Sequence, residues 1–135
     1  MSQSQATRAR PTSPHLTVWR PTITYVMSIV HRITGAALYF GTLLVALWLV
    51  AAATSEAWFD FASWAFGSWL GRIVLLGYTW ALLHHMLGGI RHFVWDTGAG
   101  LEKHTATRIA WATLIGSIVL TIAVWITGYA ARGAF

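Results

Sequence analysis

The chain has 135 residues, of which 56% are hydrophobic and only 10% charged, whereas about a quarter of an ordinary soluble domain is charged. The composition argues against a soluble single domain, because so small a core cannot bury nine Trp, four Tyr and six Phe. Cysteine is absent, so this chain holds no disulfide, iron–sulfur cluster or thioether-linked haem. The formal charge of +5 does not indicate nucleic-acid binding, since the basic residues are dispersed along the sequence.

Three long uncharged intervals, residues 33–55, 73–90 and 109–131, predict three transmembrane helices. Each is close to the roughly 20 residues that a spanning helix requires, and the alternating pattern of a membrane barrel is missing. With their flanks, we place the helices at about 24–53, 67–96 and 106–131. The sequence therefore predicts an all-α membrane protein with a cytoplasmic N-terminal arm, residues 1–22, and a transmembrane anchor domain, residues 23–135.

The distribution of basic residues predicts the orientation of these helices. Cytoplasmic loops carry an excess of Lys and Arg, and no apolar stretch of a cleavable signal peptide follows the first arginines. We therefore expect a cytoplasmic N-terminus, an external C-terminus and an aromatic segment, residues 58–69, at the outer interface. The basic residues on the predicted cytoplasmic side are Arg8, Arg10, Arg20, Arg32, Arg91, Lys103 and Arg108, and those on the other side are Arg72 and Arg132.

Polar residues near the cytoplasmic end of the first predicted helix are candidates for function, because such groups are costly in a membrane. Ser28 and Arg32 lie four residues apart and share one helix face, whereas His31 points about 100° away from Arg32. A hydroxyl and a guanidinium can both donate hydrogen bonds to a quinone carbonyl and stabilise negative charge on it. The alternative is that Arg32 extends to the interface and His31 bonds a neighbouring carbonyl.

The second predicted helix carries the remaining histidines of the membrane region. His85, Gly89, His92 and Asp96 form one stripe, with His84, Gly88 and Arg91 on the adjoining stripe. The paired glycines remove side-chain bulk where a flat macrocycle could approach the backbone, which favours haem. The alternative is a notch for helix packing, with histidines that form hydrogen bonds between helices.

Geometry restricts how this chain could ligate a haem iron. His85 and His92 are about 10 Å apart along one helix and cannot occupy opposite axial positions. His31, beside Arg32, suits the haem propionates better than the iron. We therefore infer that the second axial histidine belongs to a partner chain. His92 and Asp96 lie where they could relay protons from the cytoplasmic side.

Two motifs make the chain resemble the cytochrome b membrane-anchor subunit of succinate dehydrogenase, respiratory complex II. Residues 10–16 (Arg-Pro-Thr-Ser-Pro-His-Leu) and 28–35 (Ser-Ile-Val-His-Arg-Ile-Thr-Gly) are similar to the first signature of that family. Residues 85–98 (His-Met-Leu-Gly-Gly-Ile-Arg-His-Phe-Val-Trp-Asp-Thr-Gly) are similar to the second. The motifs occur in the expected order and, with the three predicted helices, extend the match over nearly the whole chain.

The resemblance implies a heteromeric helix bundle with one haem b, ligated by His85 and by a histidine of a second small membrane-anchor subunit. It further implies that His31 and Arg32 lie near the haem propionates and that Ser28, Ile29 and Arg32 line the ubiquinone site. A flavoprotein subunit oxidises succinate and an iron–sulfur subunit delivers the electrons, so this chain would anchor the complex without oxidising succinate itself. The leader resembles mitochondrial and related bacterial forms without a transit peptide, which implies the bacterial inner membrane.

Two other functions are consistent with the same residues. The first is the anchor of a quinol:fumarate reductase, which uses the same chemistry in the opposite direction. The second is a purely structural or transport protein whose polar residues pack helices, and this alternative predicts no haem.

Overall fold

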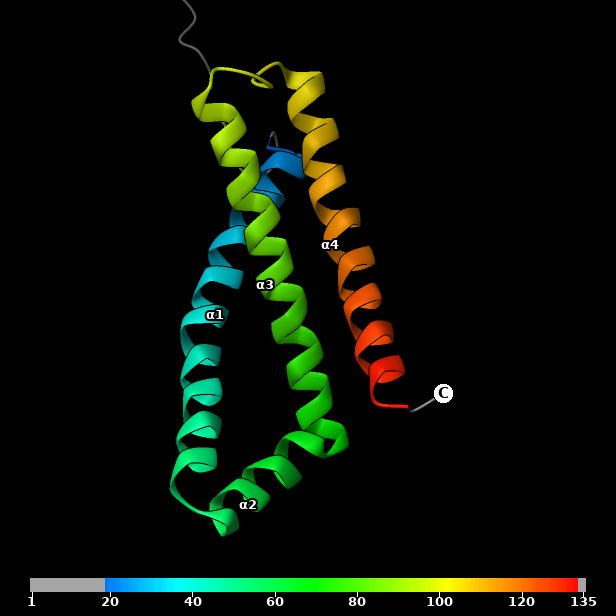
Figure 1. Ribbon diagram of the computed structural model, residues 1–135. Coiled ribbons are helices and arrows are strands. Elements are labelled where there is room, and N and C mark those ends of the chain that lie inside the picture. The colour runs from blue at the N-terminus through cyan, green and yellow to red at the C-terminus, as the bar shows by residue number, and fades with distance from the viewer. Residues whose placement is uncertain (1–18, 134–135) are drawn as a thin grey trace, which may run out of the picture.

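The structure of the chain is a computed structural model that describes residues 19–133. This part contains four helices: α1 (Ile23–Thr54), α2 (Glu56–Gly67), α3 (Trp69–Asp96) and α4 (Lys103–Ala131) (Figure 1). The helices α1, α3 and α4 are long and apolar enough to cross a membrane, which confirms the predicted all-α fold with three spans. Residues 1–18, which include the first part of the first signature and most of the predicted arm, lie outside the described residues.

The short helix α2 connects α1 to α3 at one end of the molecule (Figure 1). Two serines set its limits, because each has an extended backbone and caps the next helix with its hydroxyl. Ser55 accepts a hydrogen bond from the Trp58 amide at 3.2 Å, and Ser68 accepts one from the Gly71 amide at 3.0 Å. The aromatic segment predicted at the interface is therefore a separate helix, and the second span begins at Trp69 instead of residue 67.

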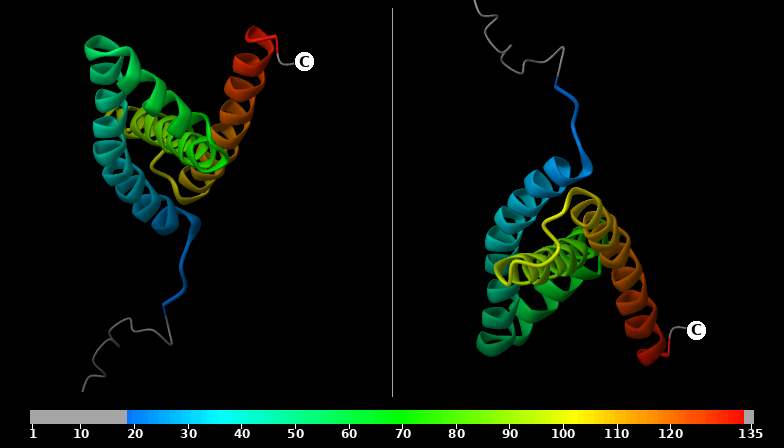
Figure 2. Two further views of the ribbon diagram at one scale, coloured as in Figure 1. Left: turned by 90° about the horizontal axis from the view of Figure 1, so that it is seen from below. Right: turned by 90° about the horizontal axis from the view of Figure 1, so that it is seen from above.

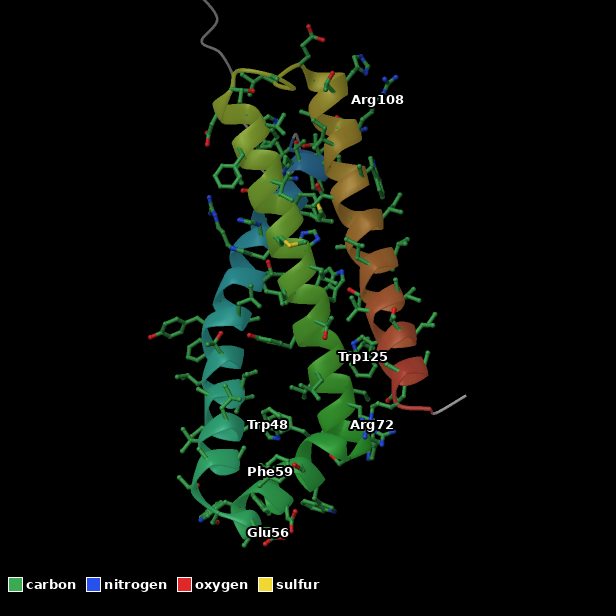
Figure 3. The ribbon with its side chains drawn as sticks, in the orientation of Figure 1. Trp48, Glu56, Phe59, Arg72, Arg108 and Trp125 are labelled. Atoms are coloured by element: carbon green, nitrogen blue, oxygen red, sulfur yellow. The ribbon has the colours of Figure 1, made fainter. Side chains whose placement is uncertain are left out.

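The opposite end of the molecule contains the start of α1 and the loop of residues 97–102 between α3 and α4 (Figure 1). Gly98 and Gly100 have φ angles of 81° and 72°, values that favour glycine, and the Trp95 indole N–H donates to the Gly100 carbonyl at 3.2 Å. We call this the loop end and the other the α2 end. Figure 3 shows Arg108 at the loop end and Arg72 at the α2 end.

The helix α3 lies between α1 and α4, and both views in Figure 2 show α1 and α4 on different sides of it. The contact with α4 depends on small and hydroxyl-bearing residues, which allow transmembrane helices to approach closely. The buried residues of α4 are Ala110, Thr113, Ser117 and Thr121. Each of these three hydroxyls donates to a carbonyl of its own helix. Most large apolar side chains are instead exposed in the isolated chain, as expected where lipid or another protein chain covers them.

Candidate functional site

The adjacent histidines of α3 face different helices. The His84 side chain is only 1% exposed and points to α4, where its Nδ1 lies 3.2 Å from the Ser117 hydroxyl oxygen. That hydroxyl donates its own proton to the Leu114 carbonyl at 2.8 Å. The oxygen is therefore left to accept, so that Nδ1 of His84 is the donor. His84 is thus enclosed between two helices of this chain and fully engaged through Nδ1.

His85 faces α1 and is only partly buried. Its Nδ1 lies 3.1 Å from the His31 carbonyl oxygen and 3.3 Å from the Thr34 hydroxyl oxygen. Thr34 Oγ1 donates to the same His31 carbonyl at 3.0 Å. Because a carbonyl can only accept, the proton of a neutral His85 is on Nδ1, and Nε2 has a free lone pair. A histidine held this way through Nδ1 is the form that binds a metal through Nε2.

Glycines on both helices make room for this arrangement. A Cβ at Gly35 would lie 3.0 Å from Cε1 of His85, and a Cβ at Gly88 would overlap the His31 ring. Gly89, in contrast, faces open space, with no atom within 4 Å of an added Cβ. The prediction that both glycines clear space for a macrocycle is therefore wrong for Gly88, because the His31 side chain of α1 fills that position. Of these two glycines, Gly89 is the one beside which the surface of α3 is open.

The His31 ring lies flat against the His85 ring. The two centroids are 3.9 Å apart and the planes are nearly parallel, at 6°. The His92 ring approaches His31 with centroids 5.4 Å apart. Within residues 19–133, Nδ1 of His31 is buried without a hydrogen-bond partner. Three histidines, two from α3 and one from α1, thus form one cluster between these helices.

The residues expected to bind ubiquinone lie next to this cluster on α1. Ser28, Ile29 and Arg32 are all exposed in the isolated chain, and Ile29 exposes 55% of its surface. Ser28 and Arg32 are one helical turn apart and face the same way. They therefore form one exposed face of α1 beside the histidine cluster.

His92 and Asp96 follow on the exposed surface of α3 toward the loop end. The His92 ring meets the Trp95 ring edge-on, with centroids 5.2 Å apart. Asp96 is the last residue of α3. Their order along the helix leads from the histidine cluster to the loop end, which is the direction expected for a proton path.

No binding role was predicted from the sequence for two buried residues of this region, Thr34 and Arg91. Thr34 is only 2% exposed, and the one available signal was its position three residues after His31, where a hydroxyl can bond the preceding turn. Arg91 is 4% exposed, and its guanidinium lies over the Trp95 ring at 5.0 Å. Its Nε and Nη1 are buried without a hydrogen-bond partner in the described part of the chain.

The sequence is similar to known membrane proteins over most of its length. The profile of the family described as "Succinate dehydrogenase/Fumarate reductase transmembrane subunit" matches residues 6–124. The succinate dehydrogenase cytochrome b556 subunit of Paracoccus denitrificans is 48% identical over 113 residues, which cover 84% of this chain and 87% of that protein.

Relatives of lower identity are also described as cytochrome b subunits of succinate dehydrogenase. The cytochrome b556 subunit of Rickettsia conorii is 33% identical over 117 residues, covering 87% of this chain and 91% of the relative. The mitochondrial cytochrome b560 subunit of Sus scrofa is 34% identical over 115 residues, which cover 84% of this chain and 68% of the relative. This chain therefore belongs to the family of succinate dehydrogenase and fumarate reductase transmembrane subunits, among the cytochrome b subunits of succinate dehydrogenase.

Proposed function

We propose that the chain is the haem b-binding membrane anchor of a succinate:ubiquinone oxidoreductase, with His85 as one axial ligand of the iron. The observation that carries this proposal is the difference between the two adjacent histidines. His85 presents a free Nε2 from a partly open position and is oriented through Nδ1 by the His31 carbonyl. His84 is enclosed against α4, so a group outside this chain has no access to it.

The same geometry favours a second ligand from another chain. The His31 and His85 rings are stacked face to face, with centroids 3.9 Å apart, so that these two imidazoles could not both bind one haem iron. This stacking leaves no space for a macrocycle between them. His85 would hold a haem from the open side of α3 beside Gly89, and the second small anchor protein of the complex would supply the other ligand. His31 and Arg32 would then neighbour the propionates.

Haem b, when bound, supplies a one-electron carrier within the membrane. The flavoprotein and iron–sulfur subunits are proposed to oxidise succinate and to deliver the electrons to the quinone site. This chain holds those subunits at the membrane. Ser28 and Arg32 donate hydrogen bonds to a quinone oxygen, and the fixed charge of Arg32 stabilises the negative charge that reduction places there. Ile29 supplies an apolar contact for the quinone ring.

Protons for quinol formation are proposed to come from the loop end. His92 and Asp96 are exposed on that side of the cluster, which supports a role in relaying protons. The charge distribution supports a cytoplasmic loop end, with Arg20, Arg32, Lys103 and Arg108 near it and only Arg72 and Arg132 near the α2 end. The charge distribution thus favours a cytoplasmic N-terminus, and the bacterial relatives support a location in the bacterial inner membrane.

The haem assignment is tested by the dithionite-reduced minus oxidised absorption spectrum of the purified complex. His85→Ala should abolish the b-type spectrum, and the matched variant His84→Ala should retain it. Loss of the spectrum in His84→Ala alone would show that His84, and not His85, is the iron ligand. A wild-type complex without any b-type spectrum would refute haem binding and favour the purely structural or transport protein.

The quinone assignment requires a separate measurement. Arg32→Ala and Ser28→Ala should depress quinone reduction and leave succinate oxidation by a water-soluble artificial acceptor largely intact. Equal loss of both activities would indicate failed assembly and contradict a direct role in the quinone site.

A fumarate reductase anchor is the second candidate, because the matching family description covers both enzymes. The relatives with the cytochrome b556 name are succinate dehydrogenase subunits, which supports succinate oxidation. Succinate:quinone and quinol:fumarate rates measured in the same membranes distinguish the two, and a large excess of the second rate would reverse the proposal.

A further inference from the structure

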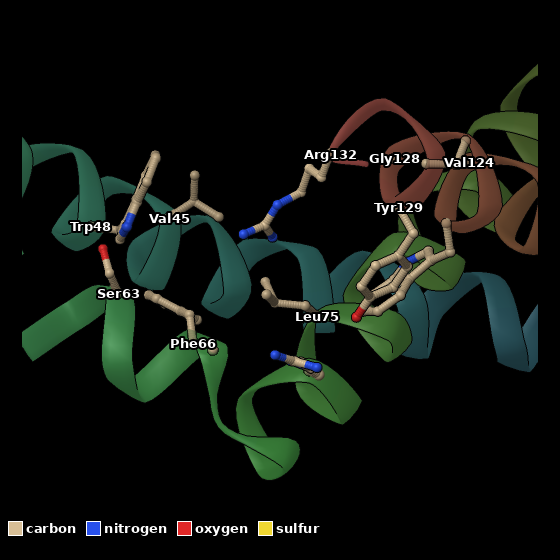
Figure 4. Close-up of a pocket in the computed structure, with 12 residues that line it drawn as sticks. Val45, Trp48, Ser63, Phe66, Leu75, Val124, Gly128, Tyr129 and Arg132 are labelled. Atoms are coloured by element: carbon tan, nitrogen blue, oxygen red, sulfur yellow. The ribbon is translucent and has the colours of Figure 1, made fainter. Parts of the chain in front are cut away.

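A cavity of about 680 Å³ opens between the helices at the α2 end, remote from the histidine cluster. All four helices contribute to its lining, and Figure 4 shows Val45 and Trp48 of α1 facing Tyr129 and Arg132 at the end of α4. A volume of this size is within the range of sites that bind small molecules. The cavity is therefore large enough for a ligand headgroup and belongs to no part of the proposed haem or quinone site.

The charge of this cavity is entirely positive. Arg72 and Arg132 both line it, and there is no Asp or Glu among the described residues that line it. In Figure 4 the Arg132 side chain reaches toward the α1 side of the cavity instead of away from it. Both arginines are exposed in the isolated chain, and an anion in the space that they line would be attracted by both guanidinium groups.

The positions of the two arginines at the helix ends have opposite electrostatic consequences. Arg132 is the C-cap of α4, where the helix dipole favours a cation. Arg72 lies in the first turn of α3, where the dipole is positive and favours an anion. The helix dipole thus stabilises the positive charge of Arg132 and destabilises that of Arg72. A bound anion would reverse this balance, because it would interact with Arg72 and with the positive end of α3 together.

The walls of the cavity are apolar and aromatic. Trp48, Phe66, Leu75 and Val124 contribute apolar surface, and Trp125 is held in the wall by a hydrogen bond from its indole N–H to the Thr79 hydroxyl at 3.3 Å. Such rings are typical of the level of lipid headgroups. A ligand that satisfies both walls and arginines therefore has an anionic head and an apolar tail.

We propose that this cavity binds an anionic phospholipid of the leaflet at the α2 end, with its phosphate between Arg72 and Arg132. The acyl chains leave along the apolar outer surfaces of α1 and α4. Arginine forms bidentate hydrogen bonds with phosphate oxygens, and two uncompensated guanidinium groups favour a headgroup with net negative charge over a zwitterionic one. The lipid would bridge the free end of α4 to the corner between α1, α2 and α3.

The test uses the complete complex, delipidated in detergent, and phosphatidylglycerol as the probe. Binding is measured by native mass spectrometry as lipid is titrated, with phosphatidylethanolamine in parallel. The double variant Arg72→Gln/Arg132→Gln should bind phosphatidylglycerol at least about tenfold more weakly than wild type, because it loses both charged phosphate contacts. Arg72→Lys/Arg132→Lys should recover part of this loss, and Arg108→Gln, an exposed arginine at the loop end, should behave as wild type. Co-elution of all subunits confirms that each variant is assembled.

Four results would overturn the proposal. The first is equal binding of phosphatidylglycerol by wild type and the double variant. The second is equal affinity of wild type for phosphatidylethanolamine, which would show that the anionic charge is not recognised. The third is no saturable lipid binding at all, which is expected if a helix of the partner anchor protein fills the cavity. The fourth is competition by inorganic phosphate as strong as that by the lipid, which would refute the role of the apolar walls.

Discussion

Replacement of Thr34 by valine isolates one hydrogen bond beside the proposed iron ligand. Valine keeps the branched shape of threonine at a position that is 2% exposed but removes the hydroxyl. Two contacts are lost: the donation from Thr34 Oγ1 to the His31 carbonyl at 3.0 Å and the contact of Oγ1 with Nδ1 of His85 at 3.3 Å. The His31 carbonyl remains as an acceptor for Nδ1 at 3.1 Å. The His85 proton therefore stays on Nδ1, but the ring is less firmly oriented.

The size of the effect follows from these contacts. One neutral hydrogen bond contributes about 1 kcal/mol, which corresponds to about a fivefold change in an equilibrium constant at 25 °C. Loss of partners behind a metal-bound histidine typically weakens metal binding by about 10–100-fold. Since the carbonyl acceptor is retained, we expect haem binding in Thr34→Val to weaken about fivefold to tenfold. The haem midpoint potential should also change, because the basicity of the ligand depends on its Nδ1 contacts.

Haem per complex and the midpoint potential are measured by pyridine haemochrome analysis and by redox titration of the b-type spectrum. Thr34→Ser is the matched control, because it keeps the hydroxyl and removes only a methyl group. It should stay close to wild type in both measurements. The reasoning would be refuted if Thr34→Val kept the wild-type haem content and potential, or if Thr34→Ser changed them as much as Thr34→Val did.

Two further variants probe the packing around the histidines. Ser117→Ala leaves Nδ1–H of the buried His84 without its acceptor, which should lower the free energy of unfolding by about 1–3 kcal/mol. Thermal melting of the assembled complex measures this loss, and a simultaneous loss of the b-type spectrum would contradict the separate roles of the two histidines. Gly88→Ala should impair assembly because its methyl group overlaps the His31 ring, whereas Gly89→Ala faces open space and should leave assembly intact. Equal assembly of both variants would show that α1 and α3 are not this close.

The long helices could be predicted from the sequence because charge and hydropathy alone determine where a chain can cross lipid. The spans expected at 24–53 and 106–131 are Ile23–Thr54 and Lys103–Ala131 in the structure. The helix α2 could not be predicted as a separate helix, although its aromatic character is evident in the sequence. Its ends depend on the caps formed by Ser55 and Ser68, and serines are too common in such segments to mark a boundary by themselves.

The site was predictable in its residue types but not in its contacts. His84 and His85 are neighbours in the sequence, and a helix separates their directions by about 100°. Which of them faces α4 depends on how the helices pack, and the sequence of α3 alone does not contain this information. For the same reason the sequence pattern associated Gly88 with a macrocycle, whereas its actual neighbour is the His31 ring of α1.

The acceptor for His85 Nδ1 is a main-chain atom of α1 and not a side chain. Substitutions at position 31 can therefore alter the ring, the charge and the polarity beside the ligand while the carbonyl stays in place. Substitution of His31 is therefore expected to change the surroundings of the proposed iron ligand without removing the acceptor of its Nδ1 proton. Because this acceptor is a backbone carbonyl, it is retained whichever side chain is present at position 31.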